Sequence, residues 1–437
     1  MTEATPTIPS EDVPPAKQQR RRRIARWIIF FTLLFVALWF SRPAFNRFAL
    51  SRARANLEQR NHDAALVWLN RAMMLNDNHA ETHFLLARTY RRLEDFAKVN
   101  HHLKKAHDLG WDLKQLEREQ NIALAQTGQF SAMARHFPEL FMNAGSDGPE
   151  ISQAYVLMLM SQFRLQPAME VLDAWQRDFP EDPQPYVLRG RALSVIRNWK
   201  EAEDQYKRAL ELSSTHWEAR RELAKCLMEQ LRFKEAEEHL RKCLNHDASD
   251  VKAAVAYATC LRKRNQLEQA RSLLKKHWDH LQDDLDALRE MGQIELAAER
   301  PKQAVKYLRL AVKQNPVDRE TRYILAQALR AAGETQAAQK ELAFVNQATK
   351  PVLRLGQLVP KLVDDPENID LRFEIAKITW TYKSRPEGVR WFQSLLQFAP
   401  DHSPTHLALA RHYELEGDTE KAAFHRRKAG TANSTTP

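Results

Sequence analysis

Small and large apolar residues recur along this chain at helical spacing, and the same spacing returns every 34 residues. Within "NWKEAEDQYKRALEL" (residues 198–212), Ala202, Tyr206 and Ala209 stand at offsets of 0, 4 and 7, which places them on one face of a helix. Later copies are Ala236/Leu240/Cys243, Ala270/Leu274/His277, Ala304/Leu308/Ala311 and Ala338/Leu342/Val345. Weaker copies precede and follow this run. A fixed period of this length predicts a repeat array.

A second column of small residues lies twelve positions before the first member of each triplet. Its members are Ala87, Gly190, Ala224, Ala258, Gly292, Ala326, Ala376 and Ala410. Small residues let two helices approach closely, and large neighbours fill the gaps beside them. Each repeat is therefore expected to be a pair of packed helices. A single pair buries too few apolar side chains to offset its lost conformational entropy, so neighbouring repeats must stack.

This two-helix unit resembles the tetratricopeptide repeat (TPR) family. The clearest copies are "YVLRGRALSVIRNWKEAEDQYKRAL" and "THLALARHYELEGDTEKAAFHRRKA". The resemblance implies an all-α, right-handed α-solenoid of about 11 helix–turn–helix repeats with a concave inner wall. We expect repeats 1–9 over residues 46–352, an inserted helix or kink over 353–368, and repeats 10 and 11 with a C-terminal cap over 369–430. Residues 431–437 are expected to form a disordered tail.

The segment "RRRRIARWIIFFTLLFVALWFSRP" predicts one N-terminal transmembrane helix. Residues 1–23 read as a disordered tail that becomes strongly basic, and residues 24–41 would form a helix of roughly 27 Å. The residues expected to form the anchor are Trp27, Ile28, Phe30, Phe31, Leu34, Phe35, Leu38 and Trp39. No small-residue cleavage site follows closely, so an uncleaved signal anchor is favoured over a cleaved signal peptide. The dense basic flank predicts a cytoplasmic N-terminus and an extracytoplasmic body, with the reverse orientation left open.

Composition and charge narrow the function classes. Only 11 glycines occur in 437 residues, which favours helices over a fold rich in tight turns. The net charge is +10, but residues 1–60 hold 11 Lys and Arg against 4 Asp and Glu, while the remainder holds 55 against 52. A nucleic-acid binder should carry its positive charge on the folded body, so nucleic-acid binding is disfavoured.

No arrangement in the sequence indicates catalysis or metal binding. The three cysteines form no CxxC pair and are interpreted as small packing residues. The His79/His83 and His402/His406 pairs have the i,i+4 spacing that metal sites use, but no glutamate completes an HExxH motif. We find no Ser/His/Asp set and no phosphate-binding loop. We therefore expect no enzyme activity, no catalytic residue, no bound metal and no cofactor.

Function is expected on the concave wall, which the TPR resemblance assigns to positions 2, 5, 9 and 12–13 of each first helix. The candidate peptide-binding groove consists of Arg88, Arg91, Arg191, Arg221, Lys225, Arg262, Lys263, Arg289, Arg330, Tyr323, Phe373 and Trp380. Such a groove suits an extended, partly acidic peptide held by Arg–carboxylate contacts and apolar pockets. A plain solvated helix face is the alternative, because Glu218, Glu229 and Glu320 stand among the arginines.

The sequence thus predicts a membrane-anchored TPR scaffold or adaptor that binds protein partners and assembles a complex at a membrane, in a bacterial envelope. Two alternatives remain. One is a regulatory subunit of an envelope biogenesis or secretion machine. The other is a solenoid that binds a glycan or small molecule at Tyr323, Phe373 and Trp380. Neither the identity of the partner nor the oligomeric state follows from the sequence.

Overall fold

The structure, a computed structural model, describes residues 43–127 and 136–432. Within these ranges the chain forms helices, turns and bends and contains no strand, which confirms the all-α prediction there. The chain divides after Thr127 into two units, which are described separately. The predicted tail and anchor, residues 1–41, lie outside the described residues. In the described part, no helix combines the length and the apolar character that a membrane span needs.

The first unit consists of successive antiparallel helices. Residues 43–58 are helical. The helices that follow are α2 (His62–Leu75), α3 (Ala80–Arg92), α4 (Phe96–Asp108) and α5 (Leu113–Gln126). α3 packs against α2 and, more extensively, against α4. These helices therefore form the stacked pairs that the 34-residue period predicts.

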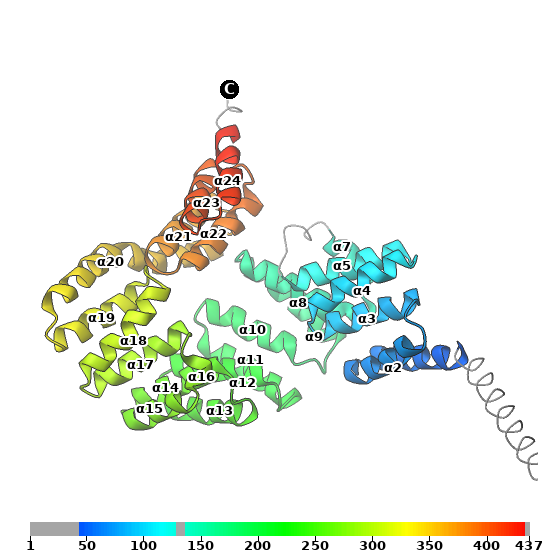
Figure 1. Cartoon of the computed structure of the whole chain (residues 1–437), viewed down its shortest axis with the longest axis horizontal. Coiled ribbons are helices and arrows are strands. Elements are labelled where there is room, and N and C mark those ends of the chain that lie inside the picture. The colour runs from blue at the N-terminus through cyan, green and yellow to red at the C-terminus, as the bar shows by residue number, and fades with distance from the viewer. Residues whose placement is uncertain (1–42, 128–135, 433–437) are drawn as a thin grey trace, which may run out of the picture. The chain divides into compact units, whose positions relative to one another are not determined.

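The second unit is itself built of stacked helix pairs (Figure 1). Its elements are α7 (Phe137–Met142), the 3₁₀ turn η1 (Gly145–Asp147), α8 (Gly148–Ser161), α9 (Leu165–Asp178), α10 (Gln184–Val195), α11 (Trp199–Leu212), α12 (Trp217–Glu229), α13 (Phe233–His246), α14 (Val251–Lys263), α15 (Leu267–Lys276), α16 (Trp278–Leu281), α17 (Leu285–Ala297), α18 (Pro301–Gln314), α19 (Arg319–Ala331), α20 (Thr335–Asp364), α21 (Ile369–Tyr382), α22 (Arg385–Phe398), α23 (Ser403–Leu415) and α24 (Thr419–Ala432). The second helix of each repeat packs on its own first helix and on the first helix of the next repeat, as in a helical solenoid.

In most repeats of the described residues, the turn between the two helices has one residue with a positive φ. These residues recur with nearly the same period: Arg60, Glu94, Phe163, Arg197, Leu231, Asn265, Glu299, Gly333 and Gly417. Only the last two of these turns use glycine. The others hold an L-residue in the left-handed region, at about 1–2 kcal/mol each. Packing of the two joined helices must offset this cost.

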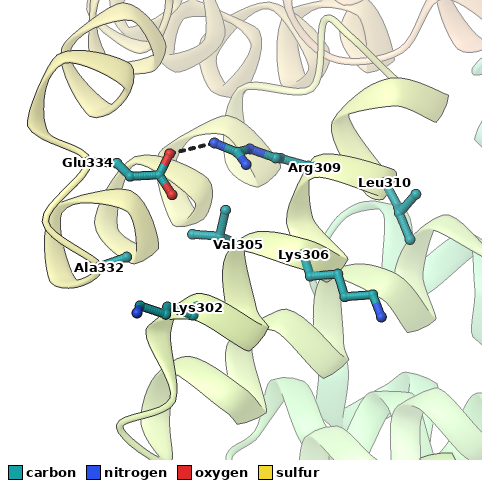
Figure 2. Close-up of a pocket in the computed structure, with 7 residues that line it drawn as sticks. All are labelled: Lys302, Val305, Lys306, Arg309, Leu310, Ala332 and Glu334. Atoms are coloured by element: carbon teal, nitrogen blue, oxygen red, sulfur yellow. Dashed lines mark hydrogen bonds and ion pairs between the residues drawn. The ribbon is translucent and has the colours of Figure 1, made fainter.

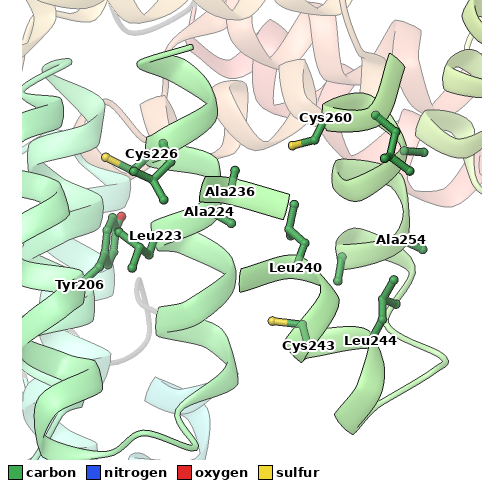
Figure 3. Packing of buried hydrophobic residues seen from close by; sticks show 14 of the residues in the cluster. Tyr206, Leu223, Ala224, Cys226, Ala236, Leu240, Cys243, Leu244, Ala254 and Cys260 are labelled. Carbon is green, nitrogen blue, oxygen red and sulfur yellow. The ribbon is translucent and has the colours of Figure 1, made fainter. Parts of the chain in front are cut away.

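Small residues at the helix crossings allow close packing, as the sequence predicts. Ala202, Tyr206 and Ala209 of α11 are buried. The position on α10 opposite the tyrosine is Gly190, where an added Cβ would lie 2.5 Å from the ring of Tyr206. Figure 3 shows the core of the neighbouring repeats, in which the three cysteines lie among leucines and alanines. All three are buried and form no disulfide, so they act as small packing residues.

Residues 353–364 do not form a separate inserted helix, which was one of the two predicted alternatives. α20 runs unbroken from Thr335 to Asp364, so this segment extends the second helix of its repeat. Two prolines lie inside α20, and each removes one intrahelical hydrogen bond. Leu358 and Leu362 are buried against α21, and burial of each such side chain contributes roughly 1.5–3 kcal/mol. This apolar contact explains why the helix continues through the prolines.

Repeats that are distant in the sequence meet within the second unit. The ring of Phe163, in the turn after α8, stacks on Trp391 of α22 with centroids 5.0 Å apart. The side-chain amide of Gln162 donates to Gln397 at 3.0 Å. The backbone carbonyl of Gln162 accepts a hydrogen bond from Arg372 of α21. The array therefore curves far enough for the end of α8 to touch α21 and α22 (Figure 1).

The first helices form the inner layer of this curve. Consecutive first helices contact one another, α10 with α12, α12 with α14, α14 with α17 and α17 with α19, whereas consecutive second helices approach less closely. In a curved two-layer array, the more crowded layer lies inside. We call the solvent-facing surface of α10, α12, α14, α17, α19, α21 and α23 the inner face. Exposed residues of these helices include Lys225, Lys263, Tyr323, Arg330, Lys377, Leu407 and Arg411.

Candidate functional site

Most of the arginines predicted to line a groove are paired with carboxylates of the next repeat. Arg262 of α14 donates from Nε and Nη2 to the two carboxylate oxygens of Glu290 on α17, at 2.6 and 3.1 Å. Arg221 of α12 lies 2.8 Å from the carboxylate of Asp250. Two-point contacts of the first kind are among the strongest ion pairs in proteins. These guanidinium groups are therefore already bound within the chain.

Two of the partner carboxylates also cap helices. Asp250 is the N-cap of α14 and accepts a hydrogen bond from the backbone of that helix. Asp318 does the same for α19 and lies 3.3 Å from Nη1 of Arg289. The Arg221–Asp250 and Arg289–Asp318 pairs both join residues 29 apart. This repeated spacing is the sequence signal that could have revealed the pairing in advance.

Arg191 of α10 lies between two carboxylates of α12. Its guanidinium pairs with Glu218 and, at 3.3 Å, with Glu222. Burial opposes the charge on Arg191, but the two carboxylates outweigh it and raise the arginine pKa. Burial likewise disfavours the charged form of Glu222, while Lys225 and Arg191 together lower its pKa. With Lys225 only 3.0 Å from Glu222, the charges at this point largely cancel.

In the first unit, one carboxylate binds both predicted groove arginines. Glu119 of α5 accepts from Nε of Arg88 at 2.6 Å and from Nε of Arg91 at 2.7 Å. Arg91 is 0% exposed and Glu119 is 1% exposed. Arg91 therefore does not lie on a groove surface. It holds α3 against α5, and the fully shielded pair contributes to packing rather than to recognition.

Exposed groups remain on the inner face toward its C-terminal end. Lys263 and Arg330 are exposed, and no carboxylate of the described residues lies within ion-pair distance of either. Tyr323 of α19 is 44% exposed. The ring of Phe373 is instead partly buried and packs on Phe392, with centroids 5.9 Å apart. The predicted aromatic patch is thus not continuous at the surface.

Trp380 of α21 is surrounded by residues that the sequence reasoning did not select. The guanidinium carbons of Arg385 and Arg411 lie 5.6 and 5.9 Å from the centroid of the indole ring. Nε1 of Trp380, Nε of Arg385 and Nδ1 of His412 are buried and have no hydrogen-bond partner in the described part of the chain. Burial lowers the pKa of His412, an effect that Glu416 opposes and Arg385 strengthens.

Two family models described as tetratricopeptide repeat match the chain, one at residues 197–242 and 231–291 and the other at residues 289–346. The chain therefore contains tetratricopeptide repeats. The matched residues include α12–α18, where the inter-repeat ion pairs are concentrated. No curated protein matches the chain in sequence.

Solved TPR structures resemble this chain in fold. PilW, a widely conserved type IV pilus biogenesis factor, is 18% identical, and the match covers 44% of this chain and 90% of PilW with a TM-score of 0.42. YrrB, a TPR protein with an unusual peptide-binding site, is 20% identical over 40% of this chain and 90% of YrrB, with a TM-score of 0.33. TTC0263, a thermophilic TPR protein of Thermus thermophilus, is 19% identical over 45% of this chain and 98% of TTC0263, with a TM-score of 0.33. At these values the likeness bears on no ligand or partner.

Two hollows of this TPR array are lined by residues outside the predicted groove. Figure 2 shows one of about 480 Å³ beside α18, where Arg309 pairs with Glu334 and lysines of α18 line the edge. Another, of about 680 Å³, is lined by Val195 at the end of α10, by Ile196 after it and by the extended part of α20. Both have the size of small-molecule sites. Among the described residues, no group of three His, Cys, Asp or Glu could hold a metal ion.

Proposed function

We propose that this TPR protein is a scaffold that binds an extended, partly acidic segment of a protein partner on its inner face. In this proposal, residues 24–41 hold the scaffold at a membrane. The main support for partner binding comes from the surface of α19 and α23, where exposed apolar groups and unpaired cations occur together. Tyr323 and Leu407 are 44% and 55% exposed. Arg330 and Arg411 have no carboxylate partner among the described residues.

The distribution of ion pairs supports docking at the C-terminal end of the inner face. From α10 to α17, an acidic ligand would have to displace Glu or Asp carboxylates that already bind the arginines. At Arg330 and Arg411 no such displacement is needed. A charge-assisted hydrogen bond formed there is therefore more favourable. We expect an acidic segment to bind across α19, α21 and α23 rather than along the whole groove.

Membrane attachment gives this scaffold its location. The basic flank of residues 20–26 favours a cytoplasmic N-terminus, which would place the repeats on the far side of the membrane. Residues 43–58, which follow the expected anchor in the sequence, are helical. In this proposal the array starts at the bilayer surface, and a bound partner is held close to the membrane.

Site-specific photocrosslinking in native membranes tests the docking surface. The full chain carries p-benzoylphenylalanine in place of Tyr323 or of Leu407. Leu310 of α18 is the control, because it is 44% exposed but lies on a second helix. We expect the two inner-face positions to capture the same protein and Leu310 not to capture it. The proposal fails if neither position captures a reproducible partner, or if Leu310 captures it equally well.

The same crosslinks address the two alternatives. A regulatory subunit of an envelope machine would capture one enzyme at a fixed stoichiometry, whereas a general scaffold would capture several proteins. A glycan site formed by Tyr323, Phe373 and Trp380 is not favoured, because Phe373 packs on Phe392 inside the repeat. Glycans stack on open aromatic faces, and the open face required here is missing at Phe373.

A further inference from the structure

An exposed surface of the first repeat combines aromatic rings with arginines. Phe45 and Phe48, in the helix that precedes α2, are 44% and 51% exposed, and their ring centroids lie 6.2 Å apart. The ring of Phe48 meets that of Trp68 on α2 edge to face, with centroids 5.6 Å apart. The guanidinium carbon of Arg52 lies 6.0 Å from the centroid of Phe48, and that of Arg71 lies 4.6 Å from the centroid of Trp68. We call these five residues the aromatic–arginine face.

The two arginines of this face have no carboxylate partner in the part of the chain that the structure describes. Arg52 and Arg71 are both exposed, and neither forms an ion pair there. Arg54, on the same helix as Arg52, instead pairs with Glu81. Residues 43–75 hold five arginines and no lysine, against two acidic residues. The aromatic–arginine face therefore offers positive charge that the chain does not neutralise, together with exposed apolar surface.

This combination of groups matches the interface of a lipid bilayer. Tryptophan rings lie at the level of the lipid headgroups, and the apolar side chains of an interfacial helix enter the adjoining acyl region. Guanidinium groups donate charge-assisted hydrogen bonds to phosphate oxygens, and each basic residue near an anionic surface strengthens its binding. In the aromatic–arginine face, the cations lie over the rings, so charged and apolar groups occupy one surface.

We propose that the aromatic–arginine face lies on the surface of a bilayer that contains anionic phospholipid. This inference rests on the proposed function, because residues 24–41 would bring the first repeat to the membrane. Residues 43–58, which contain Phe45, Phe48 and Arg52, follow that expected anchor in the sequence. A lipid surface is preferred to a protein partner because the anchor keeps the face within reach of the headgroups. The anchor then holds the chain in the bilayer, and the face orients the first repeat against it.

Photocrosslinking to lipid in reconstituted vesicles tests this contact. The full chain carries p-benzoylphenylalanine in place of Trp68 and is placed in vesicles of equimolar phosphatidylcholine and phosphatidylglycerol. Asn70 is the control position, because it is exposed on the same helix but, two residues later, points to nearly the opposite side. We expect the Trp68 position to form lipid adducts, detected by mass spectrometry, and the Asn70 position to form few. Equal labelling at the two positions, or none at either, would overturn the proposal.

Variants of the arginines test the preference for anionic lipid. In the mixed vesicles, the readout is the ratio of phosphatidylglycerol to phosphatidylcholine adducts at the Trp68 position. Arg52→Gln and Arg71→Gln should each lower this ratio by about fivefold, because one cation near the anionic surface is lost. Arg54→Gln removes the same charge from the same helix but outside the face, and should leave the ratio nearly unchanged. A ratio that all three variants lower equally, or that none of them lowers, would contradict the proposal.

Further measurements separate this inference from the proposed function. Phe48 carries the photoprobe in a second variant, which reports on the same face if replacement of Trp68 unfolds the first repeat. Flotation of the vesicles on a density gradient reports on the anchor. A chain that floats without adducts specific to the face overturns only the lipid contact, whereas a chain that does not float overturns the anchor as well.

The occupant of the face is tested in native membranes. We expect the probe at Trp68 to capture phospholipid there too, and capture of a protein in place of lipid would overturn the proposal. Crosslinking at Tyr323 reports on partner docking at the inner face and does not depend on any of these lipid adducts.

Discussion

His406 of α23 and His425 of α24 are joined by a hydrogen bond of 2.9 Å between their Nδ1 atoms. His83 of α3 and His102 of α4 form the same bond at the same distance in the first unit. In both pairs, the second histidine also stacks on a tyrosine of the first helix, with ring centroids 5.5 Å apart. Two repeats near opposite ends of the chain therefore use the same polar arrangement to join their helices.

The surrounding contacts determine where the protons lie. Nε2 of His83 is 2.8 Å from the carbonyl oxygen of Asp77, which can only accept. Nε2 therefore carries the hydrogen, and Nδ1 of neutral His83 accepts from the Nδ1–H of His102. His406 makes the same contact with the carbonyl of Pro400, also at 2.8 Å. Each pair is thus satisfied in the neutral state without a metal ion.

Acidification should destabilise the α3–α4 pair. Burial, followed by repulsion from His83, His101 and Lys98, lowers the pKa of His102 to about 4. An unfolded histidine titrates near pH 6.5, so between these values the unfolded chain binds more protons. Stability is complete above about pH 6.5 and falls by roughly 1–2 kcal/mol toward pH 4, since the half-buried ring is partly screened. Hydrogen exchange of α3 and α4 at pH 7.5, 6 and 5 measures this loss.

A substitution of the same ring provides the control. His102→Leu replaces the ring by the residue that occupies the matching position of α15, Leu273. We expect this variant to lose part of the pH dependence of α3 and α4 exchange. An unchanged pH dependence would assign the effect to other groups.

Loss of an inter-repeat ion pair should destabilise both helices that it joins. Arg262→Gln leaves the carboxylate of Glu290 without its two-point partner, and the Glu290 side chain is only 6% exposed. We expect a loss of about 2–4 kcal/mol, concentrated in α14 and α17. Arg309→Gln breaks the exposed pair with Glu334 and should cost under about 1 kcal/mol. Urea unfolding combined with hydrogen exchange compares the two variants.

Two glycine substitutions should destabilise the array for different reasons. Gly190→Ala places a Cβ 2.5 Å from the ring of Tyr206, and such overpacking costs about 1–3 kcal/mol. Adding Tyr206→Leu, the residue found at Leu240, should restore part of the loss. Gly333→Ala meets no atom within 4 Å but has a φ of 84°, so its cost of about 1–2 kcal/mol is one of backbone conformation. Thermal unfolding of the single and double variants separates the two causes.

Removal of residues 24–41 should release the protein from membranes. Carbonate extraction of the full chain is expected to leave it in the membrane fraction, and the shortened chain should move to the soluble fraction. Deletion of residues 1–19 alone is the control and should change nothing. Protease protection then reports on which side of the membrane the repeats lie. An unshortened chain found in the soluble fraction would contradict the anchor.

One position of the first helix holds a polar side chain whose role the repeat pattern alone did not reveal. Five side chains at equivalent positions of their first helices each donate to the carbonyl six residues earlier. They are His83, Arg220, Arg322, Arg372 and His406. These positions hold histidine or arginine, and both residue types also occur at many surface positions. The residue type alone therefore does not identify the side chains that bind the preceding turn. Only the position of the preceding turn shows that these side chains satisfy its carbonyl groups.

The sequence by itself determined the period, the paired helices and the buried positions such as Ala202, Tyr206 and Ala209. These follow from spacing within one repeat and its neighbour, and helical geometry converts spacing directly into contact. The tertiary structure decided which charges are available, burying Arg91 and pairing Arg262 while leaving Arg330 without a carboxylate among the described residues. It also kept α20 helical across its two prolines and stacked the ring of Phe163 on that of Trp391. Such contacts depend on curvature, and curvature accumulates from many small rotations between repeats that no single repeat encodes.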